Sequence, residues 1–144
     1  NPALIHRTVH VIVTNRRGDL FLQKRGIHKE IQPGRWDTSV GGHVASGEAV
    51  DAAVLRELAE ELGVVPAPPG PLFRHRYLWR NPVETELVDT FHLVHEGPFD
   101  LQAEEIDDGR FWPRPAIDRA LGTGIFTPNF EEEYRRFRTT ASPA

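Results

Sequence analysis

The stretch GGHVASGEAVDAAVLRELAEELGV, residues 41–64, carries the most informative pattern in the chain. A helix is expected over residues 48–62, because good helix formers dominate there and Gly63 suits a C-terminal cap. At 3.6 residues per turn, one stripe of this helix is apolar. That stripe is predicted to be the buried face of the helix and contains Leu55, Leu58, Ala59 and Leu62.

Three glutamates of the same helix, Glu57, Glu60 and Glu61, are related as i, i+3 and i+4, so their carboxylates converge on a different face. A solvated acidic face is the simpler interpretation, since glutamate is a good helix former. However, like charges at this spacing repel by a few tenths of a kcal/mol per pair, and a hard divalent cation turns that repulsion into binding. Arg56 flanks Glu60, and Glu48 lies in the first turn, where the helix dipole favours a carboxylate.

The wider spacing decides between these interpretations. Gly42, five residues, Glu48, seven residues and then RELAEELGV at 56–64 match every specified position of the Nudix box. With average residue usage, a window matches this pattern by chance on the order of once in 10⁹ or 10¹⁰. The chain therefore resembles the Nudix hydrolase superfamily of MutT-like proteins. This resemblance implies an α/β fold, an α/β/α sandwich around a central mixed sheet, as a single domain over residues 1–144.

The resemblance also implies a chemistry. Nudix proteins typically hydrolyse a diphosphate linkage in a nucleoside diphosphate derivative or similar small molecule, with Mg²⁺ or Mn²⁺ as cofactor. Position by position, Glu57, Glu60 and Glu61 become metal ligands, and the carbonyl of Gly41 becomes an additional one. Glu57 is also a candidate to orient or deprotonate the attacking water. Metal ions are suited to this reaction because they neutralise the diphosphate and position the water.

Five further residues are candidates for supporting or substrate-binding roles. Glu48 and Arg56 are expected to pair and to support the metal-binding carboxylates, which makes them part of the catalytic set. Arg25 is a candidate phosphate contact, with an ordinary surface arginine as the alternative. Glu105 lies in an acidic loop that either serves the site or is simply exposed. Trp36 is a candidate for stacking on a base, although large aromatic residues more often pack in cores.

A second resemblance concerns HRTVHVIVTNRRGDLFLQKR and PGRWDTSVGGHV, which are similar to type 1 isopentenyl diphosphate isomerase, a Nudix-fold enzyme. Gly41 occupies the place of that family's cysteine, and the chain has no cysteine, so isomerase chemistry is disfavoured. The resemblance implies a second metal site formed by His6, His43, Glu84 and Glu86. An isomerase-like enzyme and a nucleotide-binding Nudix protein without turnover are the alternatives to a hydrolase.

Composition excludes several other classes. The chain has 144 residues, a net charge of −4 and 39% hydrophobic residues, which suits one soluble domain without a basic field for nucleic acid or anionic membranes. No apolar run approaches the roughly 20 residues of a membrane span. The absence of cysteine excludes disulfides and thiolate metal sites and is compatible with a cytoplasmic enzyme. A homodimer is expected only by analogy with other Nudix proteins.

Strand and turn signals complete the expected element order. The expected elements are a hairpin over residues 8–25, strands over 71–80 and 84–97, a short strand at 109–114, a short helix at 115–121 and a last helix capped by Thr127 and Pro128.

Overall fold

A seven-stranded mixed sheet lies at the centre of the computed structural model, which describes residues 4–140. The strands are β1 (Ile5–Thr14), β2 (Leu20–Arg25), β3 (Trp36–Asp37), β4 (Val40–His43), β5 (Leu72–Arg80), β6 (Thr85–Val94) and β7 (Ile106–Trp112). Five strands follow the order β3-β2-β1-β6-β5, while β4 pairs with β1 and β7 pairs with β2. Only the β1–β6 pair is parallel within this part of the chain, so the sheet is mixed.

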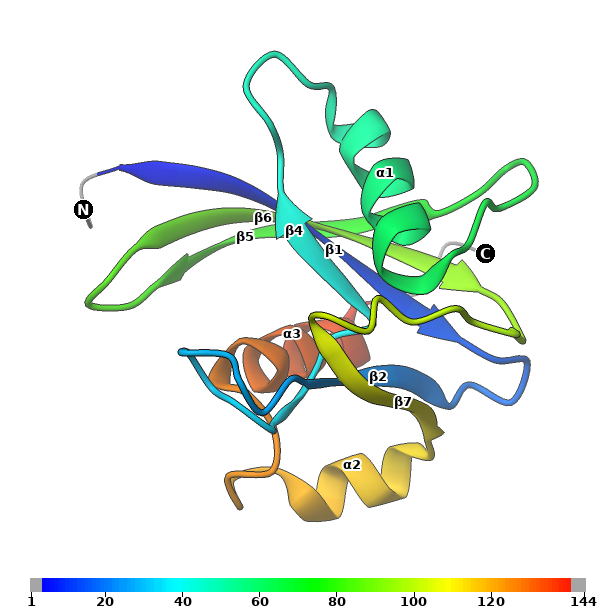
Figure 1. Ribbon diagram of the computed structural model, residues 1–144, viewed down its shortest axis with the longest axis vertical. Coiled ribbons are helices and arrows are strands. Elements are labelled where there is room, and N and C mark those ends of the chain that lie inside the picture. The colour runs from blue at the N-terminus through cyan, green and yellow to red at the C-terminus, as the bar shows by residue number, and fades with distance from the viewer. Residues whose placement is uncertain (1–3, 141–144) are drawn as a thin grey trace.

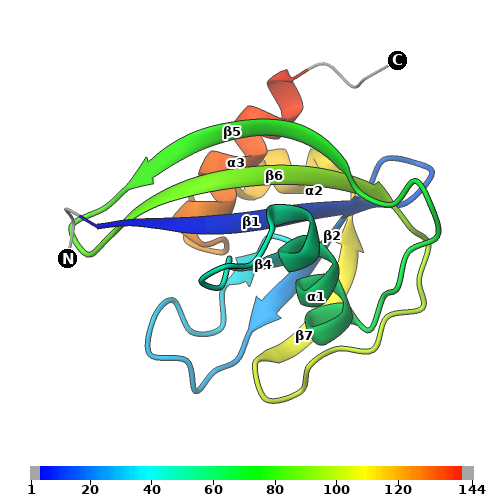
Figure 2. The ribbon, with the colours of Figure 1, turned by 90° about the horizontal axis from the view of Figure 1, so that it is seen from above.

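Helices cover both faces of this sheet. Figure 1 shows α1 (Val50–Leu62) on one side, with α3 (Pro128–Thr139) and α2 (Arg114–Ala120) on the other. Seen from above in Figure 2, β1, β6 and β5 run side by side, with α1 in front of β1 and β4 and α3 behind them. This arrangement confirms the predicted α/β sandwich.

Strand β1 shows how one strand serves two cores. Alternate side chains of a strand point to opposite faces. Val9, Val11 and Val13 therefore pack in the core beneath α1, while Ile12 packs in the core beneath α2 and α3. The first core also contains Leu58 and Leu62 of α1, and the second contains Phe126, Phe130, Tyr134 and Phe137.

The buried face of α1 differs from the prediction. Leu55 is 49% exposed and Ala59 is exposed, so placing them in the buried stripe was wrong. The buried residues of α1 are Ala53, Val54, Glu57, Leu58, Glu61 and Leu62. The helix is rotated so that Glu57 lies against Gly42 of β4, where the absence of a side chain leaves room for its carboxylate.

The other predicted elements are present with small shifts of their ends. Gly63 ends α1 in the left-handed conformation at φ 65°, and the hydroxyl of Thr127 accepts a hydrogen bond from the Phe130 amide at 3.0 Å. The β1–β2 hairpin closes through Thr14 and Leu20, but most of β2 pairs with β7. None of the helices within residues 4–140 is long and apolar enough to cross a membrane.

Candidate active site

A cavity of about 670 Å³ opens between α1, β4, the β2–β3 loop and the β5–β6 hairpin. Its volume lies within the range of small-molecule binding sites. Several elements that are distant in the sequence contribute to its wall. The predicted site residues that line it are Arg25, Gly41, His43, Glu57, Glu61, Glu84, Glu86 and Glu105.

Two buried carboxylates form the α1 side of this cavity. Glu57 and Glu61 are 9% and 8% exposed and lie one turn apart on the helix. Glu57 packs so closely against Gly42 that a Cβ atom on residue 42 would lie 2.3 Å from its carboxyl carbon. Glycine at position 42 is therefore required for the approach of the Glu57 carboxylate to β4.

The electrostatics of this pair suit a cation. Burial, together with the adjacent Glu57 carboxyl, raises the pKa of Glu61 to about 9. The Gln23 side-chain amide donates hydrogen bonds to Glu61 Oε1 at 2.7 Å and to the Ser39 carbonyl at 3.0 Å, which fixes the Glu61 carboxyl. Close carboxylates are the oxygen donors that Mg²⁺ and Mn²⁺ prefer, and Gly41 lines the same cavity. The donor set therefore fits a hard divalent cation.

Arg56 connects the predicted supporting residues. Its Nε and Nη2 atoms donate to the two Glu48 carboxylate oxygens at 2.8 and 2.9 Å, and Nη2 also donates to the His43 carbonyl at 3.0 Å. Its Nη1 atom donates to Glu57 at 2.7 Å and to Glu60 at 3.3 Å. The hydrogen bonds from Arg56 lower the pKa of Glu48 to about 2, so that pair is fully charged at neutral pH. The Glu48–Arg56 pair links β4 to α1 and orients Glu57.

Glu60 has a different environment from Glu57 and Glu61. Its side chain is 51% exposed, and within residues 4–140 its carboxylate contacts Arg56 without lining the cavity. The structure therefore brings two of the three box glutamates into the cavity wall and leaves the third at the surface.

A second group of ligand atoms also belongs to residues that line the cavity. One ligand atom each from His43, Glu84 and Glu86 falls within 4.8 Å of the other two. Burial, together with the neighbouring Glu84 carboxyl, raises the pKa of Glu86 to about 7. His6 is adjacent, since it pairs with Glu86 in the β1–β6 register and its ring centroid lies 5.7 Å from that of His43, but it is not part of the three-residue group.

The predicted substrate-binding residues have different positions. Arg25 lines the cavity, donates to the Ile31 carbonyl at 3.0 Å and lies 3.6 Å from Asp37. Glu105 also lines it and is paired with Lys29. Trp36 does not line the cavity.

Trp36 packs instead against the core beneath α2 and α3. Its ring meets Trp112 edge-on at 5.3 Å between centroids, and the Arg110 guanidinium lies 5.2 Å from its ring centroid. This position disfavours base stacking by Trp36, because the indole packs against the core and does not line the cavity.

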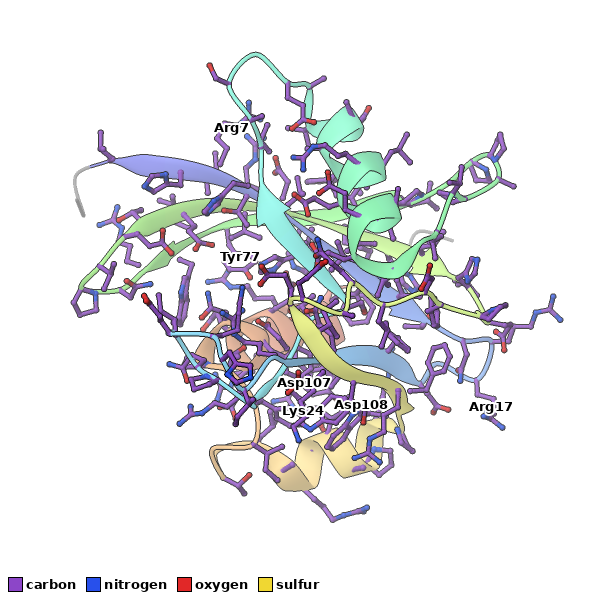
Figure 3. The ribbon with its side chains drawn as sticks, in the orientation of Figure 1. Arg7, Arg17, Lys24, Tyr77, Asp107 and Asp108 are labelled. Atoms are coloured by element: carbon purple, nitrogen blue, oxygen red, sulfur yellow. The ribbon has the colours of Figure 1, made fainter. Side chains whose placement is uncertain are left out.

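Sequence reasoning missed a polar cluster on the other face of the sheet. The buried Glu133 carboxylate of α3 accepts hydrogen bonds from His10 Nδ1 at 2.8 Å, His75 Nε2 at 2.7 Å, Thr90 Oγ1 at 2.5 Å and Tyr77 Oη at 3.2 Å. Figure 3 shows Tyr77 between the sheet and α3. In the sequence, the EEE run of the last helix is typical of a solvated face. The only signal for this cluster is in β1, where His10 lies within a run of buried apolar residues and is therefore a candidate for a buried polar side chain.

Buried charge in this cluster is compensated by its donors. Burial alone would raise the pKa of Glu133, but the hydrogen bonds from His10 and His75 lower it to about 2. Burial lowers the pKa of His10, but its hydrogen bond to Glu133 and the negative charges of Glu133, Asp37 and Glu86 together outweigh that effect, so the net change is a rise. The cluster therefore holds an ionised carboxylate in the interior beside the cavity.

Comparison with known proteins connects this geometry to a family. Residues 4–130 match the NUDIX domain. The chain belongs to the Nudix family. An uncharacterized Nudix hydrolase of Pseudomonas aeruginosa is 37% identical over 119 residues, which are 81% of this chain and 69% of that protein. The chain is accordingly a Nudix hydrolase, of a family that generally uses divalent metal ions.

Two further similarities mark the breadth of the family. An isopentenyl-diphosphate Delta-isomerase of Streptomyces avermitilis is 36% identical over 114 residues, which are 76% of this chain and 58% of that enzyme. The Nudix domain of Shewanella oneidensis NrtR, solved in complex with ADP ribose, shares the fold with a TM-score of 0.73 at 18% identity, covering 94% of this chain and 87% of that one.

Proposed function

We propose that this Nudix hydrolase cleaves a diphosphate linkage in a nucleoside diphosphate derivative or a similar small molecule, and that it depends on Mg²⁺ or Mn²⁺. One observation carries the proposal: the buried carboxylates of Glu57 and Glu61 lie together at the wall of a substrate-sized cavity, beside Gly41 and Gly42. Two adjacent buried carboxylates are stable as anions only beside a positive charge.

The proposed ligands are the carboxylates of Glu57, Glu60 and Glu61 and the carbonyl of Gly41. When bound, the metal supplies charge neutralisation of the diphosphate and activation of water. Glu57 and Glu61 line the cavity, whereas Glu60 lies at the surface beside Arg56 and would have to turn toward the site to bind the metal.

The other residues of the chain position this group. Glu57 is proposed to orient or deprotonate the attacking water. Arg56 holds Glu57 through its 2.7 Å hydrogen bond and is itself held by Glu48. Arg25 presents a guanidinium at the cavity and is proposed to donate hydrogen bonds to a phosphate of the substrate.

A second metal site is proposed at His43, Glu84 and Glu86, with His6 adjacent. The proximity of the three ligand atoms supports it, and the mixture of one imidazole with two carboxylates suits Mn²⁺, Zn²⁺ or Mg²⁺.

The family and the size of the cavity support the proposed class of substrate. ADP ribose, bound by the Nudix domain of Shewanella oneidensis NrtR, is a diphosphate of this class. Glu105, held by Lys29 at the cavity rim, is proposed to contact the part of the substrate beyond the diphosphate. A homodimer and a cytoplasmic location remain predictions, and light scattering tests the first.

A substrate screen tests the function. Release of phosphate or nucleotide is measured for ADP ribose, nucleoside diphosphate sugars, dinucleoside polyphosphates and isopentenyl diphosphate, with Mg²⁺ and Mn²⁺ compared at mildly alkaline pH. Glu61→Gln is expected to abolish turnover. Glu104→Gln, which changes an exposed acid outside the cavity wall, is expected to leave it intact. Survival of every substrate, or wild-type turnover by Glu61→Gln, would contradict the proposal.

A second candidate is an isomerase-like activity on prenyl diphosphates. It is favoured by the His43, Glu84 and Glu86 group in a chain that is 36% identical to the Streptomyces isomerase. Gly41 argues against it, since it provides no side chain for proton transfer at that position. Deuterium exchange into isopentenyl diphosphate without hydrolysis would favour this candidate. Ligand-induced stabilisation without any turnover would favour a nucleotide-binding protein.

A further inference from the structure

Trp79 has different surroundings from the other two tryptophans of the chain. Trp36 and Trp112 meet edge-on at 5.3 Å between ring centroids, and the Arg110 guanidinium lies over both rings. Trp79 instead lines the cavity, is partly exposed and makes no aromatic or cation–π contact within residues 4–140. Its Nε1 atom is buried, so the side-chain surface that it exposes consists of carbon atoms. Trp79 is therefore an aromatic surface at the cavity without a stacking partner in this part of the chain.

The position of Trp79 in the sheet separates it from the Glu57 and Glu61 carboxylates beside β4. Trp79 on β5 is the direct partner of Glu86 on β6, and the sheet continues from β6 through β1 to the glycines of β4. Adjacent strands are about 4.8 Å apart, so three strand spacings place β5 about 14 Å from β4. This separation is longer than a diphosphate. A group that contacts Trp79 is therefore a part of the substrate that is joined to the diphosphate through a spacer.

Helix α3 lies along β5 in the opposite chain direction. The Arg74 guanidinium near the start of β5 donates to the Phe137 carbonyl near the end of α3 at 3.2 Å. Farther along the strand, His75 Nε2 and Tyr77 Oη donate to the Glu133 carboxylate at 2.7 and 3.2 Å. The N-terminal turn of α3 therefore lies toward the far end of β5.

Asn129 is the residue of that turn that lies toward Trp79. It precedes Glu133 by one helical turn and so lies on the same face of α3. Trp79 is the next residue after Tyr77 on the same face of β5. Asn129 and Trp79 both line the cavity, and the half-buried Asn129 side chain makes no hydrogen bond within residues 4–140. An aromatic ring and a free amide thus border the same part of the cavity.

The side chains of this part of the cavity indicate the kind of group that it binds. Ile31 of the β2–β3 loop and Val83 of the β5–β6 hairpin line the cavity although they are 65% and 68% exposed. Together with Trp79 they present apolar surface, whereas the Asn129 amide presents both hydrogen-bond donors and an acceptor. A flat ring with polar groups on its edge matches both features, because it stacks on an aromatic side chain and pairs with an amide. A prenyl chain matches only the apolar part.

We propose that the group beyond the diphosphate is a nucleobase, that it stacks on Trp79, and that Asn129 forms hydrogen bonds with its edge. Ribose supplies the spacer between base and diphosphate that the position of Trp79 requires. This inference rests on the proposed function and narrows its substrates to nucleoside diphosphate derivatives. Trp79, in place of Trp36, is thus the base-stacking residue.

Calorimetry at saturating Mg²⁺ tests this inference with analogues that contain the same methylene-bridged diphosphate. The probes are methylenediphosphonate, its isopentenyl ester and the α,β-methylene analogues of ADP, GDP, CDP and UDP. Base–aromatic stacking predicts that at least one nucleoside analogue binds at least about 10-fold more tightly than methylenediphosphonate and the isopentenyl ester.

Substitution of Trp79 separates base binding from diphosphate binding. Trp79→Leu keeps apolar volume and removes the aromatic ring, so it is expected to weaken binding of the preferred nucleoside analogue about 5- to 100-fold and that of methylenediphosphonate by less than about threefold. Leu78→Ala is the control and is expected to bind both probes like the wild type, because Leu78 is 43% exposed on the same strand and does not line the cavity. Asn129→Ala is expected to weaken binding of the preferred analogue about fivefold and to reduce the differences among the bases.

Thermal unfolding of each variant, followed in parallel, separates these changes from loss of folded protein. If Trp79→Leu does not fold, the effect of Asn129→Ala on the preference among the bases decides. Three results overturn this inference alone: tighter binding of the isopentenyl ester than of every nucleoside analogue, equal affinity of the wild type for all probes, or a loss in Trp79→Leu that is absent or equal for the two kinds of probe. Failure of the wild type to bind any of the probes overturns the proposed function together with it.

Discussion

Replacement of Gly42 by alanine tests the close approach of β4 to the Nudix helix. Gly42 does not have a positive φ, so the backbone tolerates alanine and the effect is steric. The new Cβ would lie 2.3 Å from the Glu57 carboxyl carbon and 2.4 and 2.7 Å from its two oxygens. Ordinary contacts begin near 3.4 Å, so the carboxylate has to move by about 1 Å.

That displacement is larger than a metal site tolerates. Metal–oxygen distances are fixed within about 0.2 Å, and a misplacement of about 1 Å costs on the order of 10²-fold in rate. We expect Gly42→Ala to lower kcat/KM by about 100-fold and to weaken Mn²⁺ binding. The free energy of unfolding is expected to fall by only about 1–3 kcal/mol, as in other overpacked sites.

Gly109→Ala is the control, because its Cβ would lie 2.6 Å from Phe21 Cζ, away from the cavity. The assay combines kcat/KM, Mn²⁺ titration and thermal unfolding for both variants. Gly109→Ala is expected to lower the unfolding temperature and to keep kcat/KM within about threefold while it is folded. Unchanged activity in Gly42→Ala, or an equal loss of activity in Gly109→Ala, would refute the reasoning.

Three further predictions concern packing, charge and support of the site. Leu58→Ala should lower the free energy of unfolding by about 2–5 kcal/mol, because Leu58 is fully buried, whereas Leu55→Ala should lower it by less than about 1 kcal/mol. Urea denaturation measures both values, and equal losses would contradict the observed rotation of α1. Glu133 has a folded pKa of about 2, below its ordinary 4.5, so it stabilises the fold above pH 4.5 and loses this contribution as the pH falls toward 2. The difference in unfolding free energy between the wild type and Glu133→Gln should therefore be about 3 kcal/mol at pH 6 and shrink by pH 3, and a constant difference would show that the charge is irrelevant. Arg56→Lys keeps the charge but not the bidentate contact with Glu48, so it should weaken Mn²⁺ binding about 10-fold or more in a fluorescence or calorimetric titration. Wild-type Mn²⁺ affinity in this variant would show that Arg56 does not position Glu57.

Local patterns in the sequence predicted the elements well, because caps and turns act over a few residues. Gly63 and Thr127 end and begin their helices as expected. The buried face of α1 could not be predicted from such local patterns. Leucine and alanine spacing alone favoured Leu55 and Ala59 as buried, whereas in the structure Glu57 of α1 lies against Gly42 of β4, and Leu55 and Ala59 are exposed.

For the site as well, the sequence predicted which residues matter but not their burial or their long-range contacts. The box spacing identified the glutamates, but not that Glu60 is exposed while Glu57 and Glu61 are buried. The contacts of His10 with Glu133 join residues 123 positions apart, so no local pattern indicates them.

Binding of Mn²⁺ to the protein without substrate, followed by electron paramagnetic resonance, tests the central claim most directly. The account predicts that the wild type binds Mn²⁺, that Glu57→Gln and Glu61→Gln each weaken binding at least about 10-fold, and that Glu60→Gln has a smaller effect because water competes at its exposed carboxylate. Glu104→Gln, an exposed acid outside the cavity wall, should bind Mn²⁺ like the wild type. Wild-type Mn²⁺ affinity in both Glu57→Gln and Glu61→Gln would contradict the account.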